Sequence, residues 1–314
     1  MAGFFQTVKV GPVQSSRVPG AHPVILQASG NFTINADGSA TPAEISLSSE
    51  TGMRNLTGKP LEIDELRFGY NLVGLLPTPS LGTMPLVEIR IAGTLATNGF
   101  VSINGLSWTD DVAAFDETFY ALKLSRRVIL DPGEIIAIRV RFPSISLTTR
   151  SGPAIFMAAA RGIPVAEGGP AYMPWITAYP AISRTAVGVY EEESSPAVFR
   201  NDLGVPLHLD RFVGWYWSTP GANADLAWLV NAIQVGADLY RVRIVDQDGT
   251  QLIRDRTPFA IAFDSTRRYW KLGGVLPPKG FFRVTLDSDL SAPAVGIANV
   301  PTPIIGMIGY RQVR

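Results

Sequence analysis

Apolar and polar residues alternate with the two-residue period of β-strands in several short stretches of the chain. The clearest case is residues 134–142, in which the even-numbered positions from 136 to 142 are apolar and Arg139 and Arg141 lie between them. We expect strands at residues 24–35, 61–68, 134–142, 240–245 and 282–286. Helical periodicity is rare, and only residues 110–122 and 224–235 are expected to be helical. Short strands with few helices favour antiparallel β-sandwiches.

Thirty glycines and 24 prolines divide the chain into these short segments. Gly133 and Gly280 each precede an apolar run that is expected to be a strand. We expect a tight turn at both glycines, since glycine reaches positive φ without steric cost.

An eleven-residue motif occurs twice, as RNLTGKPLEID at residues 54–64 and as RNDLGVPLHLD at residues 200–210, an offset of 146. Weaker matches follow in the same order: residues 130–132 resemble 276–278 at offset 146, 115–118 resemble 263–266 at offset 148, and 151–155 resemble 291–295 at offset 140. Collinear matches with small changes of offset indicate a tandem duplication, with insertions and deletions placed in loops. The expected fold is therefore all-β, with two tandem antiparallel β-sandwiches related by internal duplication and few short helices.

The motif has the residue types of a turn that enters a strand, since Asn and Gly favour bends, Pro is tolerated where a strand begins, and Leu would face inward. The Arg and Asp of each copy are expected to pair across the turn. We interpret the motif as a structural element; a ligand-binding loop in each copy is the functional alternative. The identical positions are Arg54, Asn55, Gly58, Pro60, Leu61 and Asp64 in the first copy and Arg200, Asn201, Gly204, Pro206, Leu207 and Asp210 in the second.

The composition is that of a packed globular protein, with 314 residues, 46% hydrophobic and 17% charged. Lys and Arg number 27, as do Asp and Glu, so the net charge of zero offers no electrostatic footprint for nucleic acid, and no direct nucleic-acid binding is expected. The absence of cysteine excludes disulfides and thiolate metal sites. The charge-poor stretch at residues 290–310 contains Pro293, Pro301 and Pro303, so we expect buried strands and turns there and not a membrane span.

Signals for catalysis are weak. The two histidines, His22 and His208, occupy non-equivalent places in the repeats, and no nucleotide-binding or serine-hydrolase motif occurs. The carboxylate clusters at residues 110–111 and 191–193 are expected to be solvated, with an oxygen-rich calcium site as the minor alternative. Asp116 and Asp264 are expected to cap turns, and the acceptor-like triplets at residues 31–33 and 55–57 carry no weight without a secretory route. We expect no enzyme activity, no cofactor and no metal.

Aromatic residues gather in the second half of the chain and in the segment that joins the repeats. Exposed aromatics on a sandwich could stack on sugars, but this number is more typical of a seam between domains or subunits, which we favour. They are Tyr172, Trp175, Tyr179, Trp215, Tyr216, Trp217, Trp228, Tyr240, Tyr269 and Trp270.

Two tandem sandwiches in a helix-poor, cysteine-free and neutral chain resemble the double jelly-roll major capsid proteins of non-tailed icosahedral viruses, particularly the bacteriophages that contain a membrane. The resemblance covers the whole chain at the level of architecture. It implies a homotrimer whose six jelly rolls form a pseudo-hexagonal block of an icosahedral shell. It further implies neighbouring capsomers, an internal membrane or minor capsid proteins as partners, and a virion whose capsid is assembled in the host cytoplasm.

The expected organisation is an N-terminal arm at residues 1–22, a first jelly roll at 23–165, a linker at 166–184 and a second jelly roll at 185–314. The alternative function is a phage tail, baseplate or host-attachment protein with two carbohydrate-binding sandwich modules. A carbohydrate-active enzyme comes third, and it would need two carboxylates at glycosidase separation in an open cleft.

Overall fold

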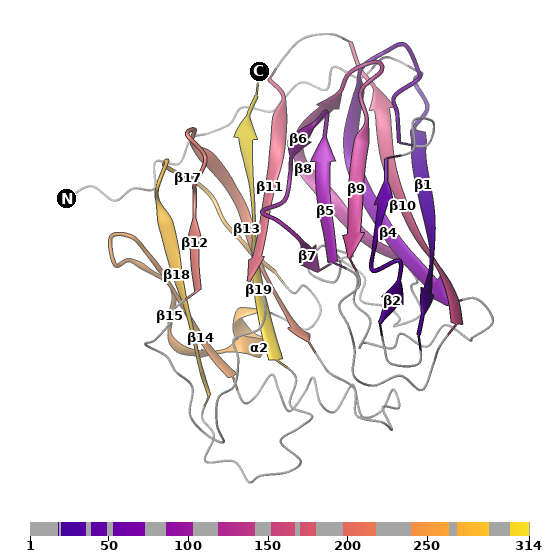
Figure 1. Ribbon diagram of the computed structural model, residues 1–314. Helices are drawn as coiled ribbons and strands as arrows, with labels where there is room; N and C mark the ends of the chain where they lie inside the picture. Colours follow the sequence, from indigo (N-terminus) through magenta and orange to yellow (C-terminus); the bar gives the residue numbers. More distant parts are fainter. Residues whose placement is uncertain are drawn as a thin grey trace.

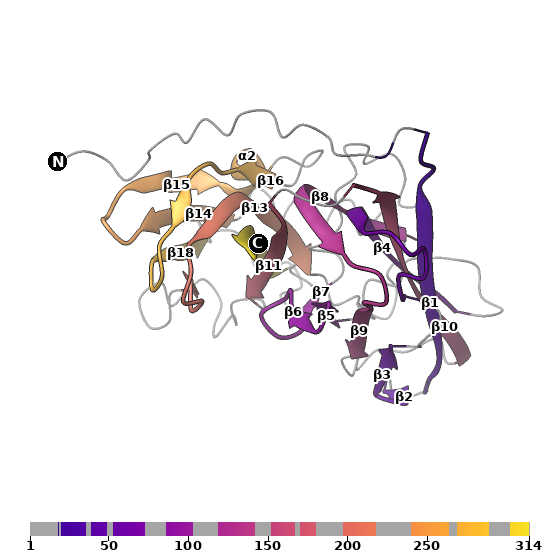
Figure 2. The same cartoon turned by 90° about the horizontal axis from the view of Figure 1, so that it is seen from above.

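The computed structural model describes residues 18, 20–35, 39–48, 53–72, 86–102, 119–141, 152–166, 170–179, 197–217, 240–263, 269–288 and 302–313. These residues are almost entirely β-strand and form two β-sandwiches that lie side by side (Figure 1, Figure 2). None of the helices in the described part of the chain has the length and hydropathy needed to cross a bilayer.

The first sandwich, here called the first roll, contains strands β1 to β10. Sheet I has the order β2-β1-β10-β4-β8, and sheet II has the order β3-β9-β5-β6, with β7 also paired to β5. The strands are β1 (Val24–Ile34), β2 (Ala40–Thr41), β3 (Glu44–Leu47), β4 (Leu61–Leu72), β5 (Leu86–Ile91), β6 (Thr94–Leu95), β7 (Val101–Ser102), β8 (Phe119–Leu130), β9 (Ile136–Arg141) and β10 (Gly152–Pro164).

The second sandwich, here called the second roll, contains strands β11 to β19 and the short helix α2. Sheet III has the order β11-β19-β13-β16, with β17 also paired to β13, and sheet IV has the order β12-β18-β14-β15. The elements are β11 (Tyr172–Tyr179), β12 (Ala197–Arg200), β13 (Leu207–Trp217), β14 (Tyr240–Asp246), β15 (Gln251–Pro258), α2 (Phe259–Ala262), β16 (Tyr269–Lys271), β17 (Val275–Leu276), β18 (Phe281–Ser288) and β19 (Thr302–Gln312).

Both rolls have the same strand order. Replacing β1, β10, β4 and β8 by β11, β19, β13 and β16 converts sheet I into sheet III, and replacing β3, β9 and β5 by β12, β18 and β14 converts sheet II into sheet IV. In each roll the first and last long strands are hydrogen-bonded neighbours, as the jelly-roll topology requires. The expected all-β fold with two jelly rolls is therefore confirmed.

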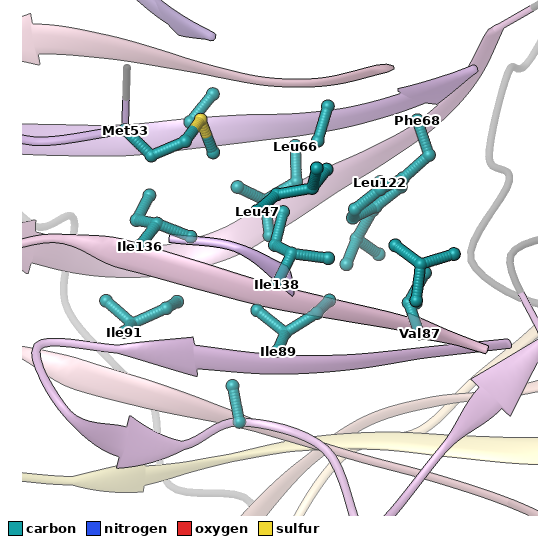
Figure 3. Packing of buried hydrophobic residues seen from close by; sticks show 14 of the residues in the cluster. Leu47, Met53, Leu66, Phe68, Val87, Ile89, Ile91, Leu122, Ile136 and Ile138 are labelled. Carbon is teal, nitrogen blue, oxygen red and sulfur yellow. The ribbon is translucent and has the colours of Figure 1, made fainter. Parts of the chain in front are cut away.

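The hydrophobic core of the first roll lies between sheets I and II. Leu66 and Phe68 of sheet I meet Ile89 and Ile138 of sheet II, and all four side chains are fully buried (Figure 3). Burial of each such side chain contributes about 1.5–3 kcal/mol, so these alternating strands carry much of the driving force for folding.

All five strands expected from alternation are present as β1, β4, β9, β14 and β18. In β4 the inward face changes phase, because Leu61 and Ile63 are buried and so are Leu66 and Phe68. The pairing register with β8 shifts between Ile63 and Glu65, so a β-bulge restores the inward direction of the later residues.

Two expectations about local structure are wrong. Residues 119–122, the end of the first expected helix, belong to strand β8, because Leu122 is buried and pairs with Leu66 across the sheet. The expected linker at 166–184 contains β11, which pairs along its whole length with β19 in sheet III. The second expected helix, residues 224–235, lies outside the described residues, as do residues 1–17 of the expected arm.

Candidate functional site

The Asn residue of the repeated motif is buried in both copies and makes the same hydrogen bonds. Asn55 Nδ2 donates to the carbonyl oxygens of Lys59 and Leu130, both at 2.8 Å. Asn201 Nδ2 donates to the carbonyl oxygens of Val205 at 3.0 Å and Leu276 at 2.9 Å. Each pair of acceptors differs by 146 positions, the offset of the motif itself.

The backbone around each Asn is also bonded alike. Asn55 N–H donates to Glu134 O and Gly133 N–H donates to Asn55 O, while Asn201 N–H donates to Gly280 O and Lys279 N–H donates to Asn201 O. The Asn therefore joins the turn before β4 or β13 to the turn before β9 or β18. The geometry is that of a structural clamp, with its polar groups used within the protein.

The remaining motif residues form the entry to a strand. Gly58 has a φ of 70°, and Leu61 and Leu207 are fully buried. Asp64 and Asp210 lie at the β-bulge of β4 and of β13, where the pairing register skips one residue. The backbone of Arg54 forms an isolated antiparallel β-bridge with Ile135. Arg200 is an exposed residue at the end of β12. Pro60, Gly204 and Pro206 lie in the turns that precede β4 and β13.

The expected pairing of Arg with Asp across the motif is wrong. Asp64 accepts a hydrogen bond of 2.9 Å from Arg161 on β10. Asp210 forms an ion pair of 2.6 Å with Arg211 and accepts from Ser125 Oγ at 2.9 Å. Because the bulge turns each Asp out of the sandwich, the carboxylate meets a neighbouring strand and not the start of the motif.

The seam between the two rolls is built from apolar contacts, hydrogen bonds and a strand bridge. It joins the outer face of sheet III to β8 and to residues 95–98 of the first roll. Five buried side chains from the second roll belong to the same apolar cluster as the core of the first roll. They are Met173, Ile176, Val213, Ile308 and Tyr310.

Tyr310 is the main polar residue of this seam. Its side chain is fully buried, and its hydroxyl oxygen accepts a hydrogen bond of 2.9 Å from the backbone N–H of Ser125 on β8. Burial, followed by the negative charge of Asp210, raises the pKa of the Tyr310 phenol. Nearby, Arg211 donates to the carbonyl oxygen of Lys123 at 2.9 Å. These bonds cross from one roll to the other and tie their orientation.

A second contact of the seam resembles strand pairing. Ile176 in β11 forms a parallel β-bridge with Thr97, and its backbone receives a hydrogen bond of 2.7 Å from Asn98 and donates one of 2.9 Å to Ala96. Arg311 donates to the carbonyl oxygen of Leu95 at 3.2 Å. The first strand of the second roll is thus attached to the first roll as well as to its own sheet.

His208 lies at the rim of the seam and faces the other roll. Its ring contacts Tyr172 edge to face with centroids 5.6 Å apart, and Arg126 of β8 lies 4.9 Å from the centre of the Tyr172 ring. Burial, followed by the positive charge of Arg126, lowers the pKa of His208. The contacts of His208 are therefore those of a packing residue at the seam. The other histidine, His22, lies before β1 and far from His208 in the sequence.

The aromatic residues expected at a seam are placed there in part. Tyr172 lies at the roll–roll contact, whereas Trp175 is buried in the core of the second roll. The side chains of Tyr179, Trp215, Tyr216, Trp217, Trp228, Tyr240 and Tyr269 lie outside the described part of the structure. Tyr310 was not singled out from the sequence, because a Tyr in a charge-poor strand carries no sign of its partner.

Other candidate residues add no site. Asn55 is buried and fully bonded, so its triplet is not an accessible acceptor. The carboxylate clusters at 110–111 and 191–193, together with Asp116 and Asp264, lie outside the described residues. Among the residues that the structure describes, no three His, Asp or Glu side chains are placed to hold a metal ion.

No protein-family model matches the chain, and no curated protein matches its sequence. Among solved structures, the chain is similar to the STIV MCP, with 11% identity, a TM-score of 0.46, and coverage of 91% of this chain and 96% of that one. It is similar to the major capsid protein P2 from bacteriophage PM2, with 12% identity, a TM-score of 0.41, and coverage of 91% and 99%. It is also similar to PNGF-II, with 12% identity, a TM-score of 0.43, and coverage of 93% and 66%.

Proposed function

We propose that this chain is a structural virion protein, a major capsid protein that forms pseudo-hexagonal trimers of an icosahedral shell. The observation that carries the proposal is the pair of jelly rolls with identical strand order, joined through a seam of unlike surfaces. The outer face of sheet III in one roll packs against the β8 edge of the other. Contacts of this head-to-tail kind form closed rings when their rotation closes.

Three chains supply six such rolls. In a closed ring of six, every second seam would lie within a chain and every other seam between chains. A chain with two similar rolls therefore needs only three copies to make a six-cornered tile, and the differences between its rolls would distinguish alternate corners.

The duplication that this geometry requires is part of the proposal. The hydrogen bonds of Asn55 and Asn201 repeat at the same offset as the sequence, and so do the β-bulges at Asp64 and Asp210. Such agreement in side-chain detail supports descent of both rolls from one ancestral roll. We retain residues 23–165 as the first roll and assign β11 to the second.

Neighbouring capsomers, an internal membrane or minor capsid proteins are the proposed partners, and the virion capsid, assembled in the host cytoplasm, is the proposed location. The Asn side chains of the repeated motif are bonded within each roll, and the hydroxyl of Tyr310 is bonded across the seam, so these polar groups are used inside the chain in structural roles.

The test is the assembly state of the purified chain. Size-exclusion chromatography with light scattering should give a mass of three chains, and negative-stain micrographs should show particles with a hexagonal outline. A stable monomer over the whole accessible concentration range would refute the capsid proposal. A monomer that also binds a glycan array would favour the alternative of a host-attachment protein.

A further inference from the structure

The seam within the chain uses two different surfaces, and each roll has its own version of both. The first surface is the outer face formed by three neighbouring long strands: β1, β10 and β4 in sheet I, and β11, β19 and β13 in sheet III. The second surface is the edge strand beside it, β8 or β16. Within the chain, sheet III covers β8, which leaves the face of sheet I and the edge of β16 unused by this seam.

Strand register identifies equivalent residues on the two faces. Glu65 pairs with Arg161, which pairs with Ile25 on β1. In the second roll Arg211 pairs with Ile308, which pairs with Ile176 on β11. Since Glu65 and Arg211 are 146 residues apart, Ile25 corresponds to Ile176.

The exposure of these counterparts differs sharply. Ile176 is 3% exposed and is held against residues 96–98 of the first roll, whereas Ile25 is 58% exposed. A large apolar side chain is thus uncovered at a position whose equivalent is closed by a roll–roll contact, although exposed groups of this size are normally few.

We propose that a second copy of this chain covers the outer face of β1, β10 and β4, with the β16 edge of its second roll placed on that face so that Ile25 becomes buried between chains. This inference rests on the proposed trimer and names the surfaces that build it. The partner is the chain itself, because the only known template for covering this type of face is the edge of a neighbouring roll.

The seam between chains is more polar than the seam within the chain. The positions of Val213 and Ile308, buried in sheet III, are taken in sheet I by Arg67 and Arg161. Arg161 pairs with Asp64 at 2.9 Å, and Arg67 is bound to Glu65.

The experiment uses the full chain and the absence of native cysteine. In the single variant I25C, the thiol should react much more slowly with a thiol-reactive label in the trimer than the thiol of the matched control L56C, which replaces an apolar residue with 69% exposure on the turn of the first motif. Chromatography with light scattering of I25D should show at least about tenfold weaker association than L56D, since burial of an Ile contributes more than 1.4 kcal/mol. Melting of I25D followed by circular dichroism should match the wild type.

The outcomes separate this inference from the proposed function. A monomeric wild type overturns both. A trimeric wild type in which the I25C thiol reacts as fast as the L56C thiol and I25D still forms trimers overturns the named surface and leaves the trimer standing. Protection of the I25C thiol together with weakened I25D trimers supports both. If I25D does not fold, the labelling rates of I25C and L56C decide alone.

Discussion

The buried Asn of the motif offers the sharpest test of how the fold is held together. In Asn201→Ala, the carbonyl oxygens of Val205, Leu276 and Pro277 lose a donor, and the N–H of Leu203 loses its acceptor, Asn201 Oδ1 at 3.1 Å. Four hydrogen bonds at about 1 kcal/mol each give an expected loss of about 3–4 kcal/mol in the free energy of unfolding. Asn55→Ala should cost a similar amount, because Asn55 makes equivalent bonds to Lys59, Leu130 and Thr57.

Urea unfolding followed by fluorescence and circular dichroism measures this loss. The exposed neighbour Asp202 provides a matched control, and Asp202→Ala should change the free energy of unfolding by less than about 0.5 kcal/mol. Asn201→Asp keeps the shape but points a carboxylate oxygen at two carbonyl oxygens, so it should destabilise at neutral pH at least as much as the Ala variant. If both Ala variants lose less than about 1 kcal/mol in the free energy of unfolding, the side-chain bonds of the Asn residues do not stabilise the turns.

Three further changes test individual contacts. Lys279 has a φ of 65°, so Lys279→Gly should raise the free energy of unfolding by about 1 kcal/mol, and an unchanged melting temperature would contradict that strain. A Cβ on Gly309 would lie 2.7 Å from Leu207 Cγ, so Gly309→Ala should lower the free energy of unfolding, measured by urea titration, by about 1–3 kcal/mol. An unchanged free energy of unfolding would mean that Leu207 on β13 moves to make room for the added methyl group. The pKa of His208 is lowered in the folded chain, so protonation favours unfolding, and stability should fall as pH drops below 6.5. His208→Gln should flatten that dependence in melts between pH 4 and 7; an identical profile would assign it to other groups.

Alternation in the sequence was sufficient to predict the strands that bury one face. Ile136, Ile138 and Val140 repeat every second residue and are fully buried, because one face of β9 meets the core. The phase change in β4 was visible in the sequence, but its cause, a bulge at Asp64, depends on pairing with β8 and β10.

The turns show why similar sequences can mislead by one residue. Gly133 and Gly280 were paired as equivalent turn residues, yet the residue with positive φ in the second roll is Lys279. Gly280 is required for another reason, because a Cβ there would lie 2.9 Å from the carbonyl oxygen of Pro277. A glycine in the sequence therefore does not show whether the position needs a positive φ or only lacks room for a side chain.

The seam could not be predicted because its residues carry no local signal. β11 contains Pro174 between apolar residues and resembles a connecting segment, while its partner β19 lies more than a hundred residues away in the chain. The bond from Ser125 to Tyr310 joins positions 185 residues apart. Only the topology brings such residues together, and the same holds for the seam partners of Ile176.

The last strand of the first roll ends at Pro164, and the first strand of the second roll begins at Tyr172. So short a connection keeps the two halves at an effective concentration in the millimolar range, far above that of separate molecules. Docking of the halves should accordingly be a unimolecular event that is finished before any second molecule is met. Growth of a larger assembly would then start from a preformed unit, and its speed would respond to protein concentration only in the later steps.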